Sequence, residues 1–523
     1  MADVKYFFDL HVHPSLKPFR YNPNRSIWIN IPDENDPDHC ENIPSIAKGI
    51  VKDVKSDGQS NLLKCQRSRT RVICVALYPI ERGMFDLRDF LAGIFNDDKE
   101  VNLGACMTSI EKATIQGYYD GIQNDDPVDY CRELFEEYQY LVAQSNDTQP
   151  GQKMVIAENY NQLKQALDAD DNSIVSVITI EGMHSLLKYN SFSELGTFDN
   201  FVNTPGHPAF DNYAEMITNN IQIIKEWGGG KHSPFFITFA HHFWNLLCGH
   251  ARSFGGLTRT FALNQDCGIN LEITELGLIA LKQLLTRENG RRILIDTKHM
   301  SVKARKQFYK LRKEEYSANN DAFPIICSHA AVNGIKTLDE ILNKEDKDRH
   351  NNNKYFNAWT INLTNEDIIE IINSDGLMGI ILHEDRMPGK IVKKRIKKFK
   401  DQLDLKRDEY VKLIMGNIFH MVRVKNEVSA WDHICLGSDF DGIINFIDIY
   451  ENVEKYDTLA DHMFQFLNRP LAIPEISLTV EDFEKLKFNL SPQEILEKVM
   501  YKNMDNFLKK YFNEQYLTKR DMA

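Results

Sequence analysis

The 523-residue sequence lacks an excess of basic residues. It contains 62 Lys and Arg against 75 Asp and Glu, which leaves a formal net charge of −13 at pH 7. Proteins that bind nucleic acid neutralise phosphates with a basic surface, so this charge balance argues against a general nucleic-acid-binding role. No glycine-rich phosphate loop follows any strand-like run, which also disfavours a nucleotide-binding protein.

Cysteine motifs and long apolar runs are missing as well. The nine cysteines are odd in number and none stands in a Cys-x-x-Cys pair, which favours reduced thiols over a disulfide framework. No apolar run approaches the length that spans a bilayer, and residues 1–5 lead into a strand-like run without a leader pattern. We therefore expect a cytoplasmic protein without a membrane partner. The sequence does not determine the oligomeric state, and a homodimer is one possibility.

The sequence does contain short β-rich runs that alternate with longer helical patterns, which is typical of a parallel α/β sheet. Its 42% hydrophobic content suffices for a large core. Most runs are continuously apolar, as expected for strands that are covered on both faces. The predicted strands lie near residues 5–10, 72–78, 174–180, 235–240, 292–296, 324–328, 377–382 and 433–438. Eight strands with helical crossovers favour a closed (β/α)8 TIM-type barrel over an open sheet.

The segments between the predicted strands differ greatly in length. A single barrel with long insertions can reach this size, so we predict one domain over residues 1–523. The excess chain lies in four excursions, at about 14–70, 79–150, 335–360 and 384–430. Each excursion follows the C-terminal end of a strand, and this is the rim on which barrels place their active-site loops.

Acidic and imidazole residues stand where the apolar runs stop. The C-terminal ends of parallel barrel strands meet at one rim, so these side chains are expected to come together there. Imidazoles and carboxylates bind divalent metal ions and transfer protons. The residues concerned are His11, His13, Glu181, His241, His299, His329 and Asp439. Taken together, they predict a rim built around metal ions.

The spacing of these residues indicates two adjacent metal sites. His11 and His13 are two apart in a strand, so their side chains point the same way and can bind one ion. Glu181 ends a buried run, where an unpaired carboxylate would be costly to bury. If it bridged two divalent ions, their positive charge would compensate its negative charge. His299 and His329 end consecutive strands and are therefore expected to be neighbours. Each residue taken singly is also explained by an ordinary structural role in the core or a loop.

Two further positions have the chemistry of catalytic groups. Asp439 lies between Gly437 and Gly442, in a turn expected to hold it over the mouth of the barrel, where it would move a proton to the leaving group. His241 follows the fourth run and could stabilise a developing oxyanion. Asp9, one step deeper than His11, is either a supporting carboxylate or part of the polar barrel lining.

In their order along the chain, these segments resemble the membrane (renal) dipeptidase family of the amidohydrolase superfamily. Ile-Glu-Gly-Met-His-Ser at 180–185 is similar to the family's Glu-Gly-Gly-His segment, and Ile-Asp-Thr-Lys-His-Met-Ser at 295–301 to its Val-Asp-Leu-Ser-His-Val-Ser. Further similar segments lie at 236–241, 326–331 and 436–442. The resemblance extends over the barrel strands from residue 5 to about 510 and omits the long excursions.

The resemblance implies a metal-dependent peptidase that cleaves a dipeptide or small amide with two divalent ions, of which zinc is the expected kind. A hydroxide that bridges the ions would attack the amide carbon. His241 would contact the substrate or transition state, and Asp439 would shuttle the proton. The implied metal ligands are Glu181 as the bridge, His11 and His13 on one ion, and His299 and His329 on the other.

Two departures from the family pattern concern the charge of the site. The first strand carries His-x-His where the family usually carries His-x-Asp, which leaves the site one unit more positive. After the sixth strand the family has an arginine that holds the dipeptide's carboxylate, and Ile361 stands in its place. Arg252, Arg386 and Lys298 are cations that could replace it. Dipeptides are thus less firmly indicated than metal-dependent hydrolysis.

Other functions are consistent with the same residues. Another hydrolase of the superfamily would act on a lactone, a phosphoester or a ring amine. A deaminase-type enzyme would use one metal ion, with Glu181 as its acid–base group. A non-catalytic barrel would serve as a binding scaffold for a protein partner, but a scaffold has no need of buried paired charges.

Overall fold

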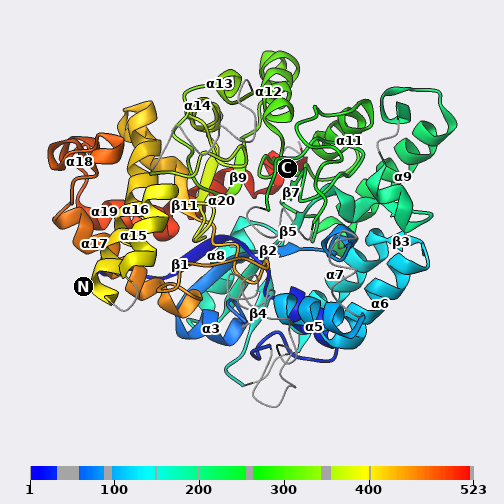
Figure 1. Ribbon diagram of the computed structural model, residues 1–523, viewed down its shortest axis with the longest axis horizontal. Coiled ribbons are helices and arrows are strands. Elements are labelled where there is room, and N and C mark those ends of the chain that lie inside the picture. The colour runs from blue at the N-terminus through cyan, green and yellow to red at the C-terminus, as the bar shows by residue number, and fades with distance from the viewer. Residues whose placement is uncertain are drawn as a thin grey trace.

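The computed structural model describes residues 2–31, 40, 58–86, 97–147, 150–197, 200–254, 263–342, 355–399 and 402–518. Parts of all four predicted excursions lie outside the described residues. Strands occupy the centre of the molecule and helices surround them (Figure 1).

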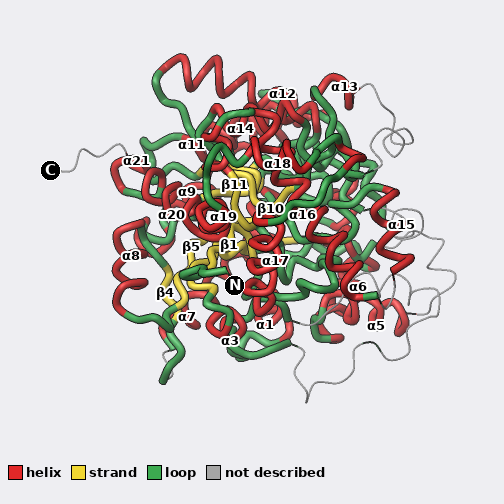
Figure 2. The backbone as a smooth tube through the Cα atoms, turned by 90° about the vertical axis from the view of Figure 1, so that its left-hand side faces the viewer, coloured by secondary structure: helices red, strands yellow, loops and turns green. Residues whose placement is uncertain are grey.

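Eight parallel strands close into a barrel. Around the ring their order is β2-β1-β11-β10-β9-β8-β7-β5, and pairing of β5 with β2 closes it. Their bounds are β1 (Phe7–Val12), β2 (Thr70–Leu77), β5 (Ile174–Glu181), β7 (Phe236–Thr238), β8 (Leu294–Asp296), β9 (Ile326–Ala330), β10 (Leu377–Ile380) and β11 (Ile434–Leu436). Each overlaps one predicted strand, which confirms the (β/α)8 TIM-type barrel. Figure 2 shows the strands enclosed by helices on all visible sides.

The barrel strands are buried on both faces. Every residue of β2 and of β5 is buried, because side chains fill the barrel interior and helices cover its outside. Three short strands were not predicted, because two or three residues establish no periodicity. They are β4 (Met154–Ile156), which extends the sheet beside β5, and the antiparallel pair β3 (Val128–Asp129) and β6 (Lys188–Tyr189).

Helices of very different length follow the strands. The longer ones are α7 (Tyr130–Asn146), α8 (Tyr160–Ala169), α9 (Pro208–Lys225), α11 (Glu275–Leu285), α12 (Val302–Leu311), α14 (Asn365–Asn373), α16 (Leu403–Lys425), α17 (Tyr456–Asn468) and α20 (Asn503–Tyr511). Shorter helices are α13 (Leu338–Leu342), α18 (Val480–Leu486), α19 (Pro492–Glu497) and α21 (Glu514–Thr518). The excursions add α1 (Leu16–Tyr21), α3 (Leu62–Arg67), α5 (Asp97–Thr108), α6 (Lys112–Gln123) and α15 (Lys390–Phe399).

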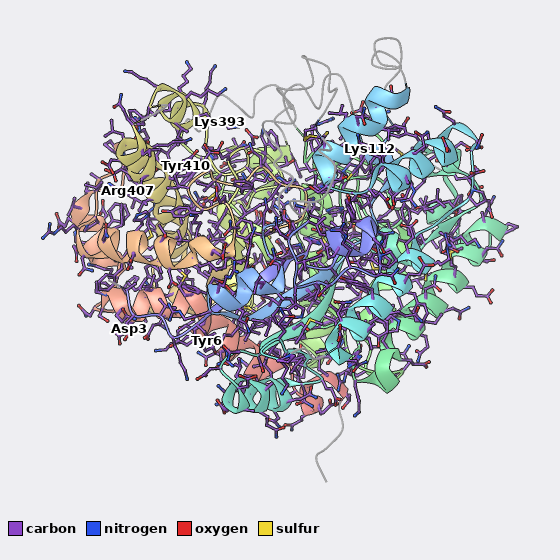
Figure 3. All side chains as sticks on the ribbon, turned by 90° about the horizontal axis from the view of Figure 1, so that it is seen from below. Asp3, Tyr6, Lys112, Lys393, Arg407 and Tyr410 are labelled. Carbon is purple, nitrogen blue, oxygen red and sulfur yellow. A yellow bond between two sulfur atoms is a disulfide. The ribbon has the colours of Figure 1, made fainter. Side chains whose placement is uncertain are left out.

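The basic run near residue 390 forms the amphipathic helix α15. Val392 on this helix is buried, while its lysines lie on the outer side. Lys393 projects close to α16, which carries Arg407 and Tyr410 (Figure 3). The Nζ of Lys393 lies 2.6 Å from Oδ1 of Asp385, so α15 is tied to the loop that follows β10.

A buried ion pair joins α12 to α14. Arg305 donates from Nε to Oδ1 of Asp367 at 2.9 Å and from Nη2 to Oδ2 at 3.2 Å. The same carboxylate accepts bonds from the hydroxyl of Tyr309 and from the backbone and hydroxyl of Thr364, each at 2.8 Å. Asp367 therefore completes the capping box of α14 and also neutralises the guanidinium of Arg305.

One pair of cysteines departs from the predicted reduced state. Cys40, in the first excursion, forms a disulfide with Cys106 on α5. The prediction of reduced thiols is wrong for this pair, because a separation of 66 residues gives no sign in the sequence that the two sulfur atoms meet. The other seven cysteines are free.

Among the residues for which the structure gives a placement, no helix is both long and apolar enough to cross a bilayer.

Candidate metal centre

The strand ends bring all seven predicted site residues to one rim of the barrel. Glu181 is the last residue of β5 and His329 lies in β9. His241, His299 and Asp439 each stand three residues beyond the end of β7, β8 and β11. None of the seven residues is more than 4% exposed, so the cluster is shielded from bulk solvent.

The first ligand set consists of His11, His13, Glu181 and Asp439. The two imidazole Nε2 atoms are 3.2 Å apart, which fits two side chains that point the same way at the end of β1. His11 Nε2 lies 3.2 Å from Oε1 of Glu181, and His13 Nε2 lies 3.2 Å from its Oε2. Oδ1 of Asp439 faces the same two nitrogens, at 3.8 and 3.5 Å. Four potential ligand atoms thus converge on one point.

The second set consists of Glu181, His299 and His329. The Nε2 atoms of the two histidines are 3.3 Å apart, and each lies 3.8 Å from Oε1 of Glu181. Oδ2 of Asp439 reaches within 3.7 Å of His329 Nε2. Glu181 therefore belongs to both sets, and the two oxygens of Asp439 face different sets.

Two of these residues have a strained backbone. His299 and Asp439 have φ of 66° and 63°, in the left-handed region that residues other than glycine seldom occupy. The sequence suggested that glycine makes the turn at Asp439, and the structure corrects this. Gly437 instead allows close packing, because a Cβ there would lie 1.9 Å from the carbonyl oxygen of Ser328.

Asp9 supports the turn that presents Asp439. Its Oδ1 accepts the backbone N–H groups of His11 at 3.1 Å and of Ser438 at 3.0 Å. Its Oδ2 accepts the hydroxyls of Ser438, at 2.6 Å, and of Tyr456. All of its contacts are with supporting groups, so Asp9 connects β1 to the turn after β11 and fixes the two ends of the first ligand set.

Glu81 is a site residue that the sequence analysis missed. Its Oε2 pairs with Nδ1 of His241 at 2.6 Å, while Nε2 of His241 lies 3.4 Å from Oε2 of Glu181. Glu81 also accepts the backbone N–H groups of His242 and Phe243. It stands four residues beyond β2, so the strand-end pattern that identified the other residues could have indicated it.

The remaining histidines near the rim make contacts of their own. Nδ1 of His242 pairs with the hydroxyl of Ser253 at 2.7 Å, and Nε2 of His184 lies 2.8 Å from the carbonyl oxygen of Pro79. His383, after β10, accepts the backbone N–H of Asp385 at Nδ1. These contacts orient the rings around the two ligand sets.

The charges of the site shift the pKa values of its members. Burial would raise the pKa of Glu181, but the surrounding imidazoles, His241 first, hold it well below its usual range. Burial would lower the pKa of His13, but hydrogen bonds to Asp439 and Glu181 raise it to about 10. Burial and nearby positive charge lower the pKa of both histidines of the second set. Glu181 is thus held as a carboxylate and the second pair of imidazoles as neutral rings, which are the forms that bind metal ions.

The donor atoms fit divalent cations. Two nitrogens bound to a tetrahedral zinc ion are about 3.3 Å apart, and the two imidazole pairs show 3.2 and 3.3 Å. Oε1 of Glu181 is buried without a hydrogen-bond partner among the residues placed by the structure, although three imidazole nitrogens surround it. Imidazole nitrogens and carboxylate oxygens that converge on one buried point are expected where cations bind.

Residues 273–473 match the membrane dipeptidase family, peptidase family M19. The matched segment includes His299, His329 and Asp439, and the resemblance predicted from the sequence is confirmed by it. No curated protein sequence matches the chain significantly.

Solved structures share the overall fold. A metallopeptidase from Rhodobacter sphaeroides, solved with a phosphinate mimic of the dipeptide L-Ala-D-Ala, is 12% identical with a TM-score of 0.52, and the alignment covers 97% of this chain and 99% of that one. Dipeptidase AC, a metallopeptidase of family M19, is 11% identical with a TM-score of 0.49, over 98% of this chain and 99% of that one. At 12% identity, the similarity to the metallopeptidase from Rhodobacter sphaeroides supports the fold alone. The chemistry of the site is inferred from the residues of this protein.

Proposed function

From the match of residues 273–473 to the membrane dipeptidase family, we propose that this protein is a metal-dependent hydrolase that cleaves dipeptides. The observation that carries the proposal is the convergence of two buried ligand sets that share Glu181. A structural barrel gains nothing from such a cluster, because buried charges are costly unless a cation or substrate uses them.

We further propose that two divalent ions, expected to be zinc, occupy the two sets. His11 and His13 would hold one ion and His299 and His329 the other, Glu181 would be shared by both, and Asp439 would serve as the proton shuttle. Imidazole and carboxylate ligands suit zinc among the common divalent ions. When bound, such ions polarise a carbonyl group and lower the pKa of water, which is the chemistry that amide hydrolysis requires.

The protein's own groups would orient the substrate and move the proton. Asp439 can accept a proton at either carboxylate oxygen, because each faces a different ligand set. His241 points Nε2 toward Glu181 and is fixed at Nδ1 by Glu81, so it can donate to an oxyanion that develops beside the carboxylate. Burial of the cluster excludes bulk water and strengthens these interactions.

Metal analysis of the purified protein tests the proposal most directly. We expect two equivalents of zinc per chain and hydrolysis of simple dipeptides that a chelator abolishes and added zinc restores. One equivalent, with activity on a ring amine, would favour the deaminase-type alternative. Absence of bound metal together with absence of hydrolysis would contradict catalysis and favour the scaffold alternative.

Glu81→Gln is expected to lower kcat by roughly 10–100-fold, the usual cost of losing a carboxylate that orients a functional histidine. Glutamine preserves the volume but not the charge that pairs with Nδ1 of His241. Steady-state kinetics and zinc analysis should show a changed kcat with both metal equivalents retained. Loss of zinc in the variant would contradict a positioning role and make Glu81 part of the metal site.

The cellular setting, the single domain and the assembly stay predictions. The disulfide between Cys40 and Cys106 favours an oxidising compartment over the predicted cytoplasm. Reaction of the intact protein with a thiol reagent before and after reduction counts the bonded cysteines. The predicted homodimer is tested by the mass of the protein in solution.

A further inference from the structure

Arg386 is a buried cation beside the ligand sets. It lies in the loop that follows β10, on the C-terminal rim, and is 5% exposed. Its Nε and Nη1 atoms are buried and have no hydrogen-bond partner among the residues that the structure describes. Burying an unpaired guanidinium is costly, so an anion is expected to meet it in the working protein.

The backbone of Arg386 is held by the segment in which the resemblance places an arginine. Asn362, next to Ile361, donates from Nδ2 to the carbonyl oxygen of Arg386 at 2.7 Å. Asn357 donates from Nδ2 to the carbonyl oxygen of Asp385 at 2.6 Å and from its backbone to that of Met387 at 3.0 Å. The segment around Ile361, which lacks the arginine, therefore supports the loop that carries a different arginine, Arg386.

The far side of the same loop is also fixed. Oδ1 of Asp385 pairs with Lys393 on α15 at 2.6 Å, and its Oδ2 accepts a bond from Nδ2 of Asn445 at 2.9 Å. Lys393 and its helix are visible in Figure 3. Both carboxylate oxygens of Asp385 are thus occupied by other partners, and the loop that carries Arg386 is fixed on both sides.

Lys298 is a second buried basic side chain. It precedes His299, is 1% exposed, and its Nζ has no hydrogen-bond partner within the described part of the chain. Besides burial, the positive charge of Arg386 lowers the pKa of Lys298, His299 and His329. Burial lowers the pKa of Arg386 itself, and the carboxylates of Asp439 and Glu181, both members of the ligand sets, oppose this shift.

We propose that Arg386, supported by Lys298, binds the carboxylate of the dipeptide substrate in place of the arginine that is absent at Ile361. This inference rests on the proposed dipeptidase function. The planar guanidinium can hold a carboxylate through two parallel hydrogen bonds, while Nζ of Lys298 supplies a further hydrogen-bond donor. Arg252, the other candidate, pairs with Asp266 at 2.9 Å and is already provided with a counter-ion.

The test compares Ala-Ala with its C-terminal amide, which has the same scissile bond and no carboxylate. We expect wild-type kcat/KM to be greater for the dipeptide than for the amide by roughly 10–100-fold, the range for hydrogen bonds to a charged group. Arg386→Gln should remove this preference by raising KM for the dipeptide while leaving the amide nearly unchanged. Arg386→Lys keeps the charge and loses the pair of parallel N–H donors. Its preference for the dipeptide should lie between those of the wild type and Arg386→Gln.

Arg252→Gln is the matched control, because it removes a guanidinium that already has a carboxylate partner, and the preference for the dipeptide should persist. Zinc content and thermal unfolding of each variant report whether the site and fold are intact. An equal loss on dipeptide and amide would give Arg386 a structural role and overturn the inference, as would a wild type without preference for the free carboxylate. If the zinc-loaded wild type cleaves neither compound, the proposed function fails and the inference falls with it.

Discussion

Glu181→Gln is expected to reduce bound zinc from two equivalents to one or none, and kcat/KM by at least about 10³-fold. The residue offers Oε1 to the second ligand set and to His11, and Oε2 to His13. An amide has one neutral oxygen and cannot bridge two cations. Metal ions supply several kcal/mol of transition-state stabilisation, and each 1.36 kcal/mol changes the rate tenfold.

Glu137→Gln provides a matched control for this variant. Glu137 on α7 is also a fully buried carboxylate, but it accepts bonds from Ser15 and from the backbone of Tyr78 instead of facing the ligand sets. Zinc analysis by mass spectrometry and dipeptide kinetics should separate the two variants. Retention of both zinc equivalents in Glu181→Gln would contradict the bridging role.

Asp367→Asn is expected to lower the free energy of unfolding by about 3–5 kcal/mol, the cost of leaving a buried charge without its partner. Arg305 is 2% exposed and would lose its counter-ion and one of its two hydrogen bonds to the side chain. The capping box of α14 would be weakened at the same time. Comparison of urea unfolding curves measures the loss.

Asp482→Asn is the control for the capping contribution. Asp482 closes the same kind of capping box with Thr479 at α18, and its hydrogen bonds there are exposed. Its loss should cost only about 1 kcal/mol. If the two variants were destabilised equally, the buried pair with Arg305 would contribute nothing beyond the cap. Zinc content should be unchanged in both, because neither carboxylate belongs to the ligand sets.

The strands and the metal-binding residue types at their C-terminal ends were predictable because both are local properties of the sequence. A continuous apolar run such as 174–180 is recognisable from its own residues, and Glu181 follows it directly. The two-residue strand β3 carries no such pattern and was missed. Glu81 stands one residue further from its strand than His241, His299 and Asp439 from theirs, and its place beside His241 depends on the path of the intervening chain.

The disulfide and the turn at Asp439 show the same limit. Nothing near Cys40 indicates Cys106, since a disulfide depends on the distance between two segments and not on either one. At Asp439 the sequence suggested that glycine bends the chain, whereas Asp439 itself has the positive φ. Hydrogen bonds from Ser438 to Asp9, which lies 429 residues away, help to hold this conformation.

By itself the sequence determined the eight strands, their closure into a barrel, and the kind of chemistry at the rim, because periodicity and strand endings are written in adjacent residues. Only the tertiary structure decided which oxygen of Glu181 meets which histidine, and that Asp439 faces both ligand sets. It also decided that Arg386, in a loop without any family motif, is buried with its Nε and Nη1 unpaired among the described residues. Such relations depend on distances between segments that are far apart in the chain. Closure of the barrel and burial set these distances, and no local sequence pattern indicates them.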